Sequence, residues 1–480
     1  MKKTRLTRAG LSTILIITAG TACGDANGPN FQRIRISGQS TLQVGDVMDV
    51  QIAATRGTVS LNDPAEFMIL GKAGEKTIYG VSAGTATVVA VLYNSDYAEV
   101  ARDSLVVTVV PPPSSNRPAF ARIQAGFGSC ANTADGGVWC WGAERAYRTY
   151  SPRCEAYVIH ALPRGCESVP ARVPGIPALS QVSVGIYSTC GLTASGEAYC
   201  WGNSPGLPGT PGLTGGGISF SSLSVQTGPG GNYPGERERI CGVTPSQQIY
   251  CWIRGSNPTS PAVISSPVPF KAVSVGGLTI GSTAGNYTAC ALDAEGDAYC
   301  WGYGALGDGN AAHTTEQTTP VAVAGGLQFK EISVGTYHVC ALTLDGTAYC
   351  WQRNNNGETG TGPGVPGSAP ILVPTAVNSS LKFTTISSGW GQTCAVATDR
   401  LAYCWGSNHG LTPDTQAPTQ VPGTFHFTSI STGFTVTCGL TVEGPEVCWG
   451  PNSYGNVGNG YIEGSRSEPT PLAGERVFGS

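Results

Sequence analysis

Short stretches of alternating apolar and polar residues run through the chain and predict β-strands. Residues 41–54, TLQVGDVMDVQIAA, place Val50 and Ile52 on one face with polar residues between them. Further strands are expected over 80–93 and 104–110. Almost no stretch repeats apolar residues with the period of about 3.6 residues that an amphipathic helix shows. The pattern therefore predicts an all-β protein.

A longer repeat begins after residue 117. Each unit contains a Cys, nine residues, a second Cys and a Trp, as in CGLTASGEAYCW at 190–201 and CALDAEGDAYCW at 290–301. The first Cys of successive units are 44 to 60 residues apart, and repeats of roughly 50 residues are typical of propellers and solenoids. The pairs are Cys130 with Cys140, Cys190 with Cys200, Cys241 with Cys251, Cys290 with Cys300, Cys340 with Cys350, Cys394 with Cys404 and Cys438 with Cys448.

Each pair brackets a predicted β-hairpin. In five units the turn ends with Gly, which accepts the positive φ of a type I turn closed by a G1 bulge. Ser246-Gln247 and Asp399-Arg400 stand at these turns in the third and sixth units, so we expect those two turns to be built differently. Two Cys opposite each other on antiparallel strands are close enough for a disulfide, and local pairing is expected.

Metal binding and catalysis by these cysteines are not expected. Structural zinc sites usually place Cys about two to four residues apart with His nearby, and the chain has only 5 His. A nucleophilic thiol would not occur in seven copies. Cys154 and Cys166 lie outside the repeat and are expected to bridge the insertion at 142–180.

A lead-in strand precedes each hairpin, as in QVSVG at 181–185, and a Pro-rich connection follows each Trp. About four strands per unit, arranged around an axis, make a seven-bladed β-propeller. Alternation within a strand places Cys200 on one face and Trp201 on the other, where neighbouring blades cover both. The tail at 469–480 is predicted to close the ring by pairing with the first blade beside 120–124.

The unit resembles the regulator-of-chromosome-condensation repeat in the disulfide-bearing form of exported bacterial proteins. An SVG-type strand, CAL, a turn Gly, YCWG and a Gly-rich tail (GYGALGDG at 302–309) carry the resemblance over about 117–480, and it implies seven blades. The family often has His two residues before the first Cys. Only His338 keeps it here, whereas other units have Ser188, Thr288 and Gln392.

Residues 31–110 lack Cys and resemble a bacterial Ig-like domain of group 2, through LQVGD, DPAEF at 63–67 and VSAGTATV at 81–88. The resemblance implies a β-sandwich that acts as a spacer. The Pro-rich stretch at 111–116 is expected to be a semi-rigid linker.

Residues 1–22 have the pattern of a signal peptide, with Lys and Arg followed by an apolar run at 11–19. GTAC at 20–23 resembles a bacterial lipobox, which implies a lipidated Cys23 and a tether over 23–30, although Gly20 stands where Leu is typical. Cleavage after Ala22 with a free Cys23 is the alternative. We expect an exported, lipid-anchored protein of the bacterial cell envelope, or a secreted one if Cys23 is not lipidated.

Charge and motifs narrow the function. Only 12% of residues are charged, the net charge is −4 and no run of like charge occurs, which gives no support for nucleic-acid binding. No nucleophile–base set or phosphate loop is apparent, so no enzyme activity and no cofactor are expected. Three irregular segments, 142–180, 226–239 and 277–286, are candidate binding loops, and the last two are expected on the same rim because they share a position in adjacent repeats. Their candidate binding residues are Tyr147, Arg148, Tyr150, Tyr157, Tyr233 and Arg237.

The resulting hypothesis is a monomeric cell-envelope lipoprotein that displays the propeller as a non-catalytic scaffold for a protein or glycan. The alternative for each segment is an insertion without a binding role, because repeat proteins tolerate changes of length in their connections. A central-channel enzyme would need acidic or His residues converging from several blades. Guanine-nucleotide-exchange activity is implied by the family's eukaryotic members, but its partners are cytosolic.

Overall fold

The structure is a computed structural model of the 480-residue chain. It describes nine strands before residue 111 and residues 119–473, except 127, 144–165, 186–187, 203–210, 227–237, 254–259, 278–286, 311–312, 363–368, 408–414, 453–454 and 461–464. Contacts divide the chain into two compact units, one with the nine N-terminal strands and one with the Cys–Trp repeats. Each unit is described by itself.

The first unit contains two sheets, with strand orders β3-β9-β8-β1-β5 and β2-β4-β7-β6. The strands predicted over 41–54, 80–93 and 104–110 are present. Thr13–Ala19, predicted as the apolar core of a leader, forms strand β1 beside β8 and β5, so removal of the leader stays a prediction. The bounds are β1 Thr13–Ala19, β2 Ile34–Ser37, β3 Thr41–Gln43, β4 Val47–Ala54, β5 Val59–Leu61, β6 Phe67–Leu70, β7 Glu75–Gly80, β8 Gly84–Tyr93 and β9 Glu99–Val110.

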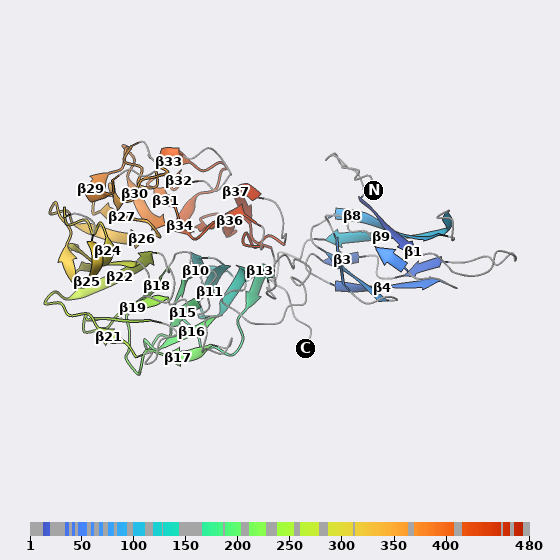
Figure 1. Ribbon diagram of the computed structural model, residues 1–480, viewed down its shortest axis with the longest axis horizontal. Coiled ribbons are helices and arrows are strands. Elements are labelled where there is room, and N and C mark those ends of the chain that lie inside the picture. The colour runs from blue at the N-terminus through green and yellow to red at the C-terminus, as the bar shows by residue number, and fades with distance from the viewer. Residues whose placement is uncertain are drawn as a thin grey trace. The chain divides into compact units, whose positions relative to one another are not determined.

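The second unit is a ring of seven antiparallel four-stranded sheets, which confirms the predicted all-β, seven-bladed propeller (Figure 1). Within each blade the strands follow chain order, from the innermost to the outermost.

Blades one to four consist of β10 Phe120–Ala125, β11 Gly128–Thr133, β12 Val138–Ala143 and β13 Cys166–Arg172; β14 Gln181–Val184, β15 Ser188–Leu192, β16 Ala198–Gly202 and β17 Gly212–Thr214; β18 Ser222–Val225, β19 Arg239–Val243, β20 Ile249–Ile253 and β21 Ala262–Val263; β22 Phe270–Gly277, β23 Tyr287–Asp293, β24 Ala298–Gly304 and β25 His313–Ala322.

Blades five to seven consist of β26 Phe329–Val334, β27 His338–Thr343, β28 Ala348–Gln352 and β29 Ile371–Ala376; β30 Phe383–Ser388, β31 Gln392–Ala397, β32 Ala402–Gly406 and β33 Thr415–Gln420; β34 Phe427–Thr432, β35 Thr437–Thr441, β36 Val447–Pro451 and β37 Ser465–Pro471.

All seven predicted Cys pairs are disulfides. The two Cys of each pair lie directly opposite each other on the second and third strands of a blade, with Cα atoms 4.1 Å apart. The bridges join Cys130 to Cys140, Cys190 to Cys200, Cys241 to Cys251, Cys290 to Cys300, Cys340 to Cys350, Cys394 to Cys404 and Cys438 to Cys448.

Seven bridges indicate an oxidising, exported environment. The eighth predicted bridge, between Cys154 and Cys166, rests on Cys154, which lies outside the described residues. Cys166 begins strand β13, the outermost strand of blade one. This bridge therefore stays a prediction.

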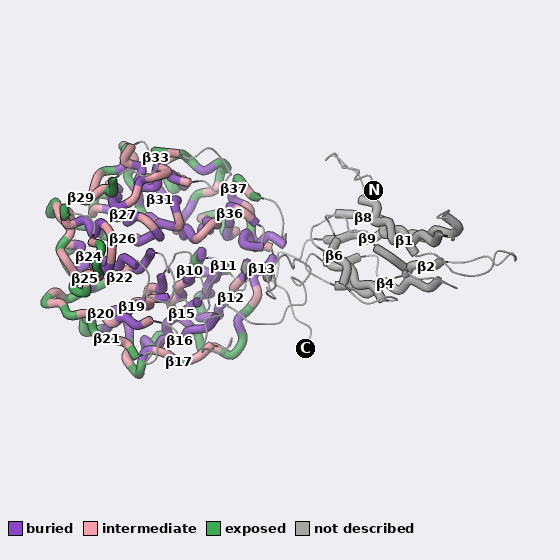
Figure 2. Tube along the Cα trace, in the orientation of Figure 1, coloured by how far each residue is buried: buried purple, intermediate pink, exposed green. Residues whose placement is uncertain are grey.

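The core lies between blades, as the alternation of Cys and Trp predicts. One cluster joins Cys290 and Cys300 of blade four to Phe329 and Trp351 of blade five, and equivalent clusters join the other neighbours. Each disulfide therefore packs on one neighbouring blade and each Trp on the other. Figure 2 shows the buried positions along the inner strands and the exposed ones toward the outside of the ring.

Serine side chains join the innermost strands. In six of the seven blade junctions, a Ser at one repeat position accepts a hydrogen bond from a backbone N–H of the next blade, at 2.9–3.0 Å. Neighbouring blades share no sheet, so these bonds fix the height of one blade against the next. The acceptors are Ser183, Ser224, Ser274, Ser333, Ser387 and Ser431.

The expectation that two hairpin turns are built differently is wrong. Gln247 and Arg400 adopt φ of 63° and 67°, the left-handed conformation that Gly196 and its equivalents adopt with φ of 85° to 106°. The same two backbone bonds close these turns as close the Gly-containing ones. The geometry is kept because the turn carbonyl also accepts a backbone N–H at the start of the next blade, at 2.7–2.9 Å; the donor is the first residue of that blade or lies two positions before it.

The described part of the predicted closing strand, residues 469–473, does not pair with the first blade, and residues 474–480 lie outside the described residues. Strand β37 pairs with β36 on the outer edge of blade seven, and the first blade is complete without it. The tail reads as a strand, but strand character does not specify which sheet a strand joins. Closure instead uses side-by-side packing of β10 against β34 and β35, with Phe120 N–H donating to Glu446 Oε1 at 2.9 Å.

Candidate functional site

The two faces of the ring differ in how much their connections vary. We call the face with the Cys–Cys hairpin turns the turn face, and the opposite one the loop-bearing face. Connections on the turn face have 4 to 5 residues within hairpins and 6 to 8 residues between blades. On the loop-bearing face, connections between first and second strands have 2 to 13 residues, and those between third and fourth strands have 8 to 22.

The segments 226–239 and 277–286 begin and end on the loop-bearing face, and so does the part of 142–180 that lies between strands β12 and β13. Val225 pairs with Ile240 on either side of the blade-three segment, and Gly277 pairs with Tyr287 on either side of the blade-four segment. The blade-one segment follows strand β12 on the same face. The candidate binding residues lie outside the described residues; they are Tyr147, Arg148, Tyr150, Tyr157, Tyr233 and Arg237.

Close to the axis, backbone atoms of neighbouring blades touch on this face. The N–H groups of Thr336, Trp390 and Phe434 donate to the carbonyls of Gly389, Gly433 and Gly126 at 3.0–3.3 Å. Each of these Gly lies so near the next blade that a Cβ would collide with its backbone or with a side chain there. Glycine is therefore required for close approach, and the residues that follow it are held on a fixed backbone.

Three aromatic side chains follow the equivalent glycines of blades five, six and seven, Gly335, Gly389 and Gly433. Tyr337, Trp390 and Phe434 are half-buried, and the Trp390 and Phe434 rings lie 4.8 Å apart between centroids. Sequence reasoning missed them. The signal that could have found them is an aromatic one or two residues after the Gly of the lead-in strand, as in GTY at 335–337 and GW at 389–390.

A charged pair with a buried carboxylate lies beside Tyr337. Arg353 Nε donates to Glu358 Oε1 at 2.9 Å, and the Arg353 guanidinium lies 3.5 Å above the Tyr337 ring. Glu358 is fully buried, and its second oxygen accepts the Asn356 N–H at 2.6 Å. A buried carboxylate is stable only with such compensation, so this arrangement is fixed in place.

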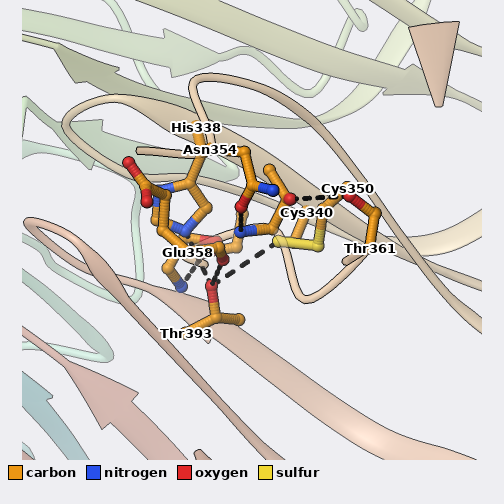
Figure 3. The surroundings of a disulfide bond; sticks show 10 residues. His338, Cys340, Cys350, Asn354, Glu358, Thr361 and Thr393 are labelled. Carbon is orange, nitrogen blue, oxygen red and sulfur yellow. Dashed lines mark hydrogen bonds between the residues drawn. A yellow bond between two sulfur atoms is a disulfide. The ribbon is translucent and has the colours of Figure 1, made fainter. Parts of the chain in front are cut away.

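His338 and Thr393 lie next to this pair and to the Cys340–Cys350 bridge (Figure 3). Thr393 Oγ1 donates its proton to the Glu358 carbonyl at 2.8 Å and contacts His338 Nε2 at 2.7 Å. His338 Nε2 must therefore be the donor to Thr393. Both side chains are buried and the hydroxyl proton is already committed, so the pair is not an activated nucleophile. Burial lowers the pKa of His338 to about 4; the Glu358 charge acts against this and the Arg353 charge adds to it.

Blades three and four carry a second Arg–Tyr–Glu cluster on the same face. The Arg239 guanidinium lies 3.7 Å above the Tyr287 ring, and both Arg239 Nη2 and Tyr287 Oη donate to Glu316 Oε1. Burial raises the pKa of Tyr287, and its hydrogen bond to Glu316 acts in the same direction. The Arg239 side chain is only 13% exposed, so this cluster is a structural one.

Within the described residues, no group of three or more His, Cys, Asp or Glu side chains is arranged to hold a metal ion. The same part of the chain contains no helix of the length and hydropathy needed to cross a membrane.

Comparison with known proteins agrees with this architecture. The family described as "Regulator of chromosome condensation (RCC1) repeat" matches residues 179–205 and 329–358. The repeat and the seven blades fit an RCC1-like propeller. No curated protein matches the sequence.

Solved structures of RCC1-like proteins share the fold. Human WBSCR16 is 16% identical with a TM-score of 0.55, covering 70% of this chain and 93% of its own. Prp20p from Saccharomyces cerevisiae is 21% identical with a TM-score of 0.52, and the match covers 65% of this chain and 80% of Prp20p. Yeast RCC1 (Prp20) bound to Kap60 is 18% identical with a TM-score of 0.54, covering 70% and 83%. Identities this low establish the fold alone.

Proposed function

We propose that this chain is an exported scaffold that binds a protein partner through the loop-bearing face of its propeller, without catalysing a reaction. One observation carries the proposal: every long or irregular connection of the ring emerges on that face, whereas the turn face keeps nearly constant connections. Loops held on a rigid scaffold are the usual carriers of binding, and the Arg- and Tyr-rich composition of 142–180 and 226–239 is typical of protein interfaces.

The N-terminal part of the proposal is a lipid anchor at Cys23 followed by an Ig-like spacer over 31–110. The lipobox-like GTAC and the strands found over the predicted segments support it. Mass spectrometry of the mature protein tests the anchor, because lipidation adds acyl chains to Cys23, whereas ordinary cleavage leaves an unmodified thiol.

Binding is tested by affinity capture from envelope extracts with the full chain and with two variants. In the first, residues 227–237 and 278–286 are shortened to the three-residue connection of blade five. The second is a matched control on the turn face, Leu344→Ser with Val442→Ser, because these side chains are 64% and 47% exposed.

A partner supports the proposal if the wild type and the turn-face control retain it and the shortened variant loses it, with affinities then measured by calorimetry. Equal capture by all three proteins, or a glycan as the retained component, contradicts it.

A further inference from the structure

Arg353 is held in one orientation on the loop-bearing face. Its backbone N–H donates to the Tyr337 carbonyl at 3.1 Å, its guanidinium stacks on the Tyr337 ring, and its Nε donates to the buried Glu358. The backbone bond fixes the main chain, and the two side-chain contacts leave the guanidinium little rotamer freedom. A flexible side chain normally loses rotamer freedom when a ligand binds, whereas the Arg353 side chain is already ordered in the chain without a ligand.

The terminal amino groups of Arg353 remain available. Among the described residues nothing accepts a hydrogen bond from Nη1 or Nη2, and the side chain is 32% exposed. A guanidinium whose Nε is occupied still presents its two Nη groups as a planar fork, which matches the two oxygens of a carboxylate.

Backbone contacts connect the Arg353 site to the aromatic residues of the next two blades. Thr336, which precedes Tyr337, bonds to Gly389, and Gly389 precedes Trp390. Trp390 is in turn in ring contact with Phe434. A charged donor fork is thus followed along the ring by a half-buried aromatic surface.

We propose that this site binds a carboxylate on a segment of the partner protein, with Arg353 gripping the acidic group and Trp390 and Phe434 contacting an adjacent apolar side chain. The proposal rests on the binding function proposed above and names what one part of that face recognises. Charge complementarity selects the ligand, because the Glu358 side chain is fully buried whereas the Arg353 side chain is 32% exposed. Arg239 offers an internal contrast, since its Nη2 is bonded to Glu316 and its side chain is more buried.

The test uses the full chain and an immobilised library of capped pentapeptides, each with one Glu or Asp beside an aliphatic or aromatic residue, and matched peptides with Gln or Asn instead. We expect acidic peptides to bind the wild type at least about tenfold more tightly than their amides. Arg353→Lys keeps the charge but removes the fork and should abolish that preference, whereas Arg239→Lys should retain it.

Trp390→Leu provides a second variant that leaves the ion pair intact. This substitution should lower the affinity for acidic peptides and for their amide counterparts by the same few-fold factor. Melting temperatures of all variants identify any that fail to fold.

The inference is overturned if the acid preference is absent, if it survives Arg353→Lys, if Arg239→Lys removes it equally, or if glucuronate alone competes as well as the peptides do. A partner that binds Arg353→Lys with full affinity but is lost on loop shortening would refute this inference while leaving the proposed function intact.

Discussion

One buried carboxylate contributes to closing the ring. At six blade junctions a hairpin-turn carbonyl accepts a backbone N–H from the first residue of the next blade or from two positions before it. At the seventh junction Glu446 Oε1 takes the place of that carbonyl and accepts from Phe120. Both residues are buried, with Phe120 7% and Glu446 3% exposed. Glu446→Ala therefore leaves a buried backbone donor without this acceptor.

The expected cost is about 1–3 kcal/mol, the usual penalty for a buried polar group that loses its partner. Unfolding entropy of about 2.1 cal/mol/K per residue converts 2 kcal/mol into a fall of roughly 3 °C in Tm for a ring of this size. Glu446→Gln keeps an acceptor oxygen, so it should lose less than Glu446→Ala.

The assay is thermal unfolding of the full chain by calorimetry, with Glu443→Ala as the control. Glu443 lies in the same blade and is exposed, and its contact with His426 is a surface one. Surface pairs of this kind contribute little, so the control should stay within about 0.5 kcal/mol of the wild type. If Glu446→Ala and Glu443→Ala unfold at the same temperature, Glu446 does not close the ring.

Three further outcomes are expected. Because the folded pKa of His338, about 4, is below its unfolded value near 6.5, the unfolded state binds the proton first. Neutral His338 therefore makes its full contribution to the free energy of unfolding above pH 6.5, and about 3 kcal/mol of that free energy is lost as the pH falls to 4. A His338→Gln variant whose stability relative to the wild type does not change with pH would contradict this. Gln247→Gly and Arg400→Gly should each raise stability by about 0.5–1 kcal/mol in chemical denaturation, since both residues occupy left-handed φ, whereas substitution by Ala should not. Joint replacement of Cys340 and Cys350 by Ser should cost roughly 2–3 kcal/mol, and an unchanged denaturation midpoint would show that this bridge does not constrain the unfolded chain.

The features that the sequence predicted are those set by local geometry. Cys190 and Cys200 pair because both belong to one hairpin, and a hairpin brings its own residues together without reference to the rest of the fold. Repetition then converted one local prediction into seven blades.

The errors arose where a distant partner decides the geometry. Gln247 and Arg400 keep the left-handed turn because the next blade needs their carbonyls, and that need is not visible at the turn itself. Strand β37 has ordinary strand character, but its sheet was fixed by β36 beside it. Glu358 and Arg353 are 5 residues apart, yet their burial depends on the position of blade six.

The same contacts explain why recognition belongs to one face. On the turn face, the hairpin carbonyls of six of the seven blades are bonded to the next blade, so an insertion there would displace the bond that sets the spacing between blades. Connections on that face stay within narrow limits for this reason. On the loop-bearing face the blades are joined close to the axis, by the glycine contacts and the serine hydroxyls of the innermost strands. Connections on the loop-bearing face can therefore lengthen without altering these contacts between blades. Because such changes do not disturb the ring, this face is the one that can be adapted to a partner.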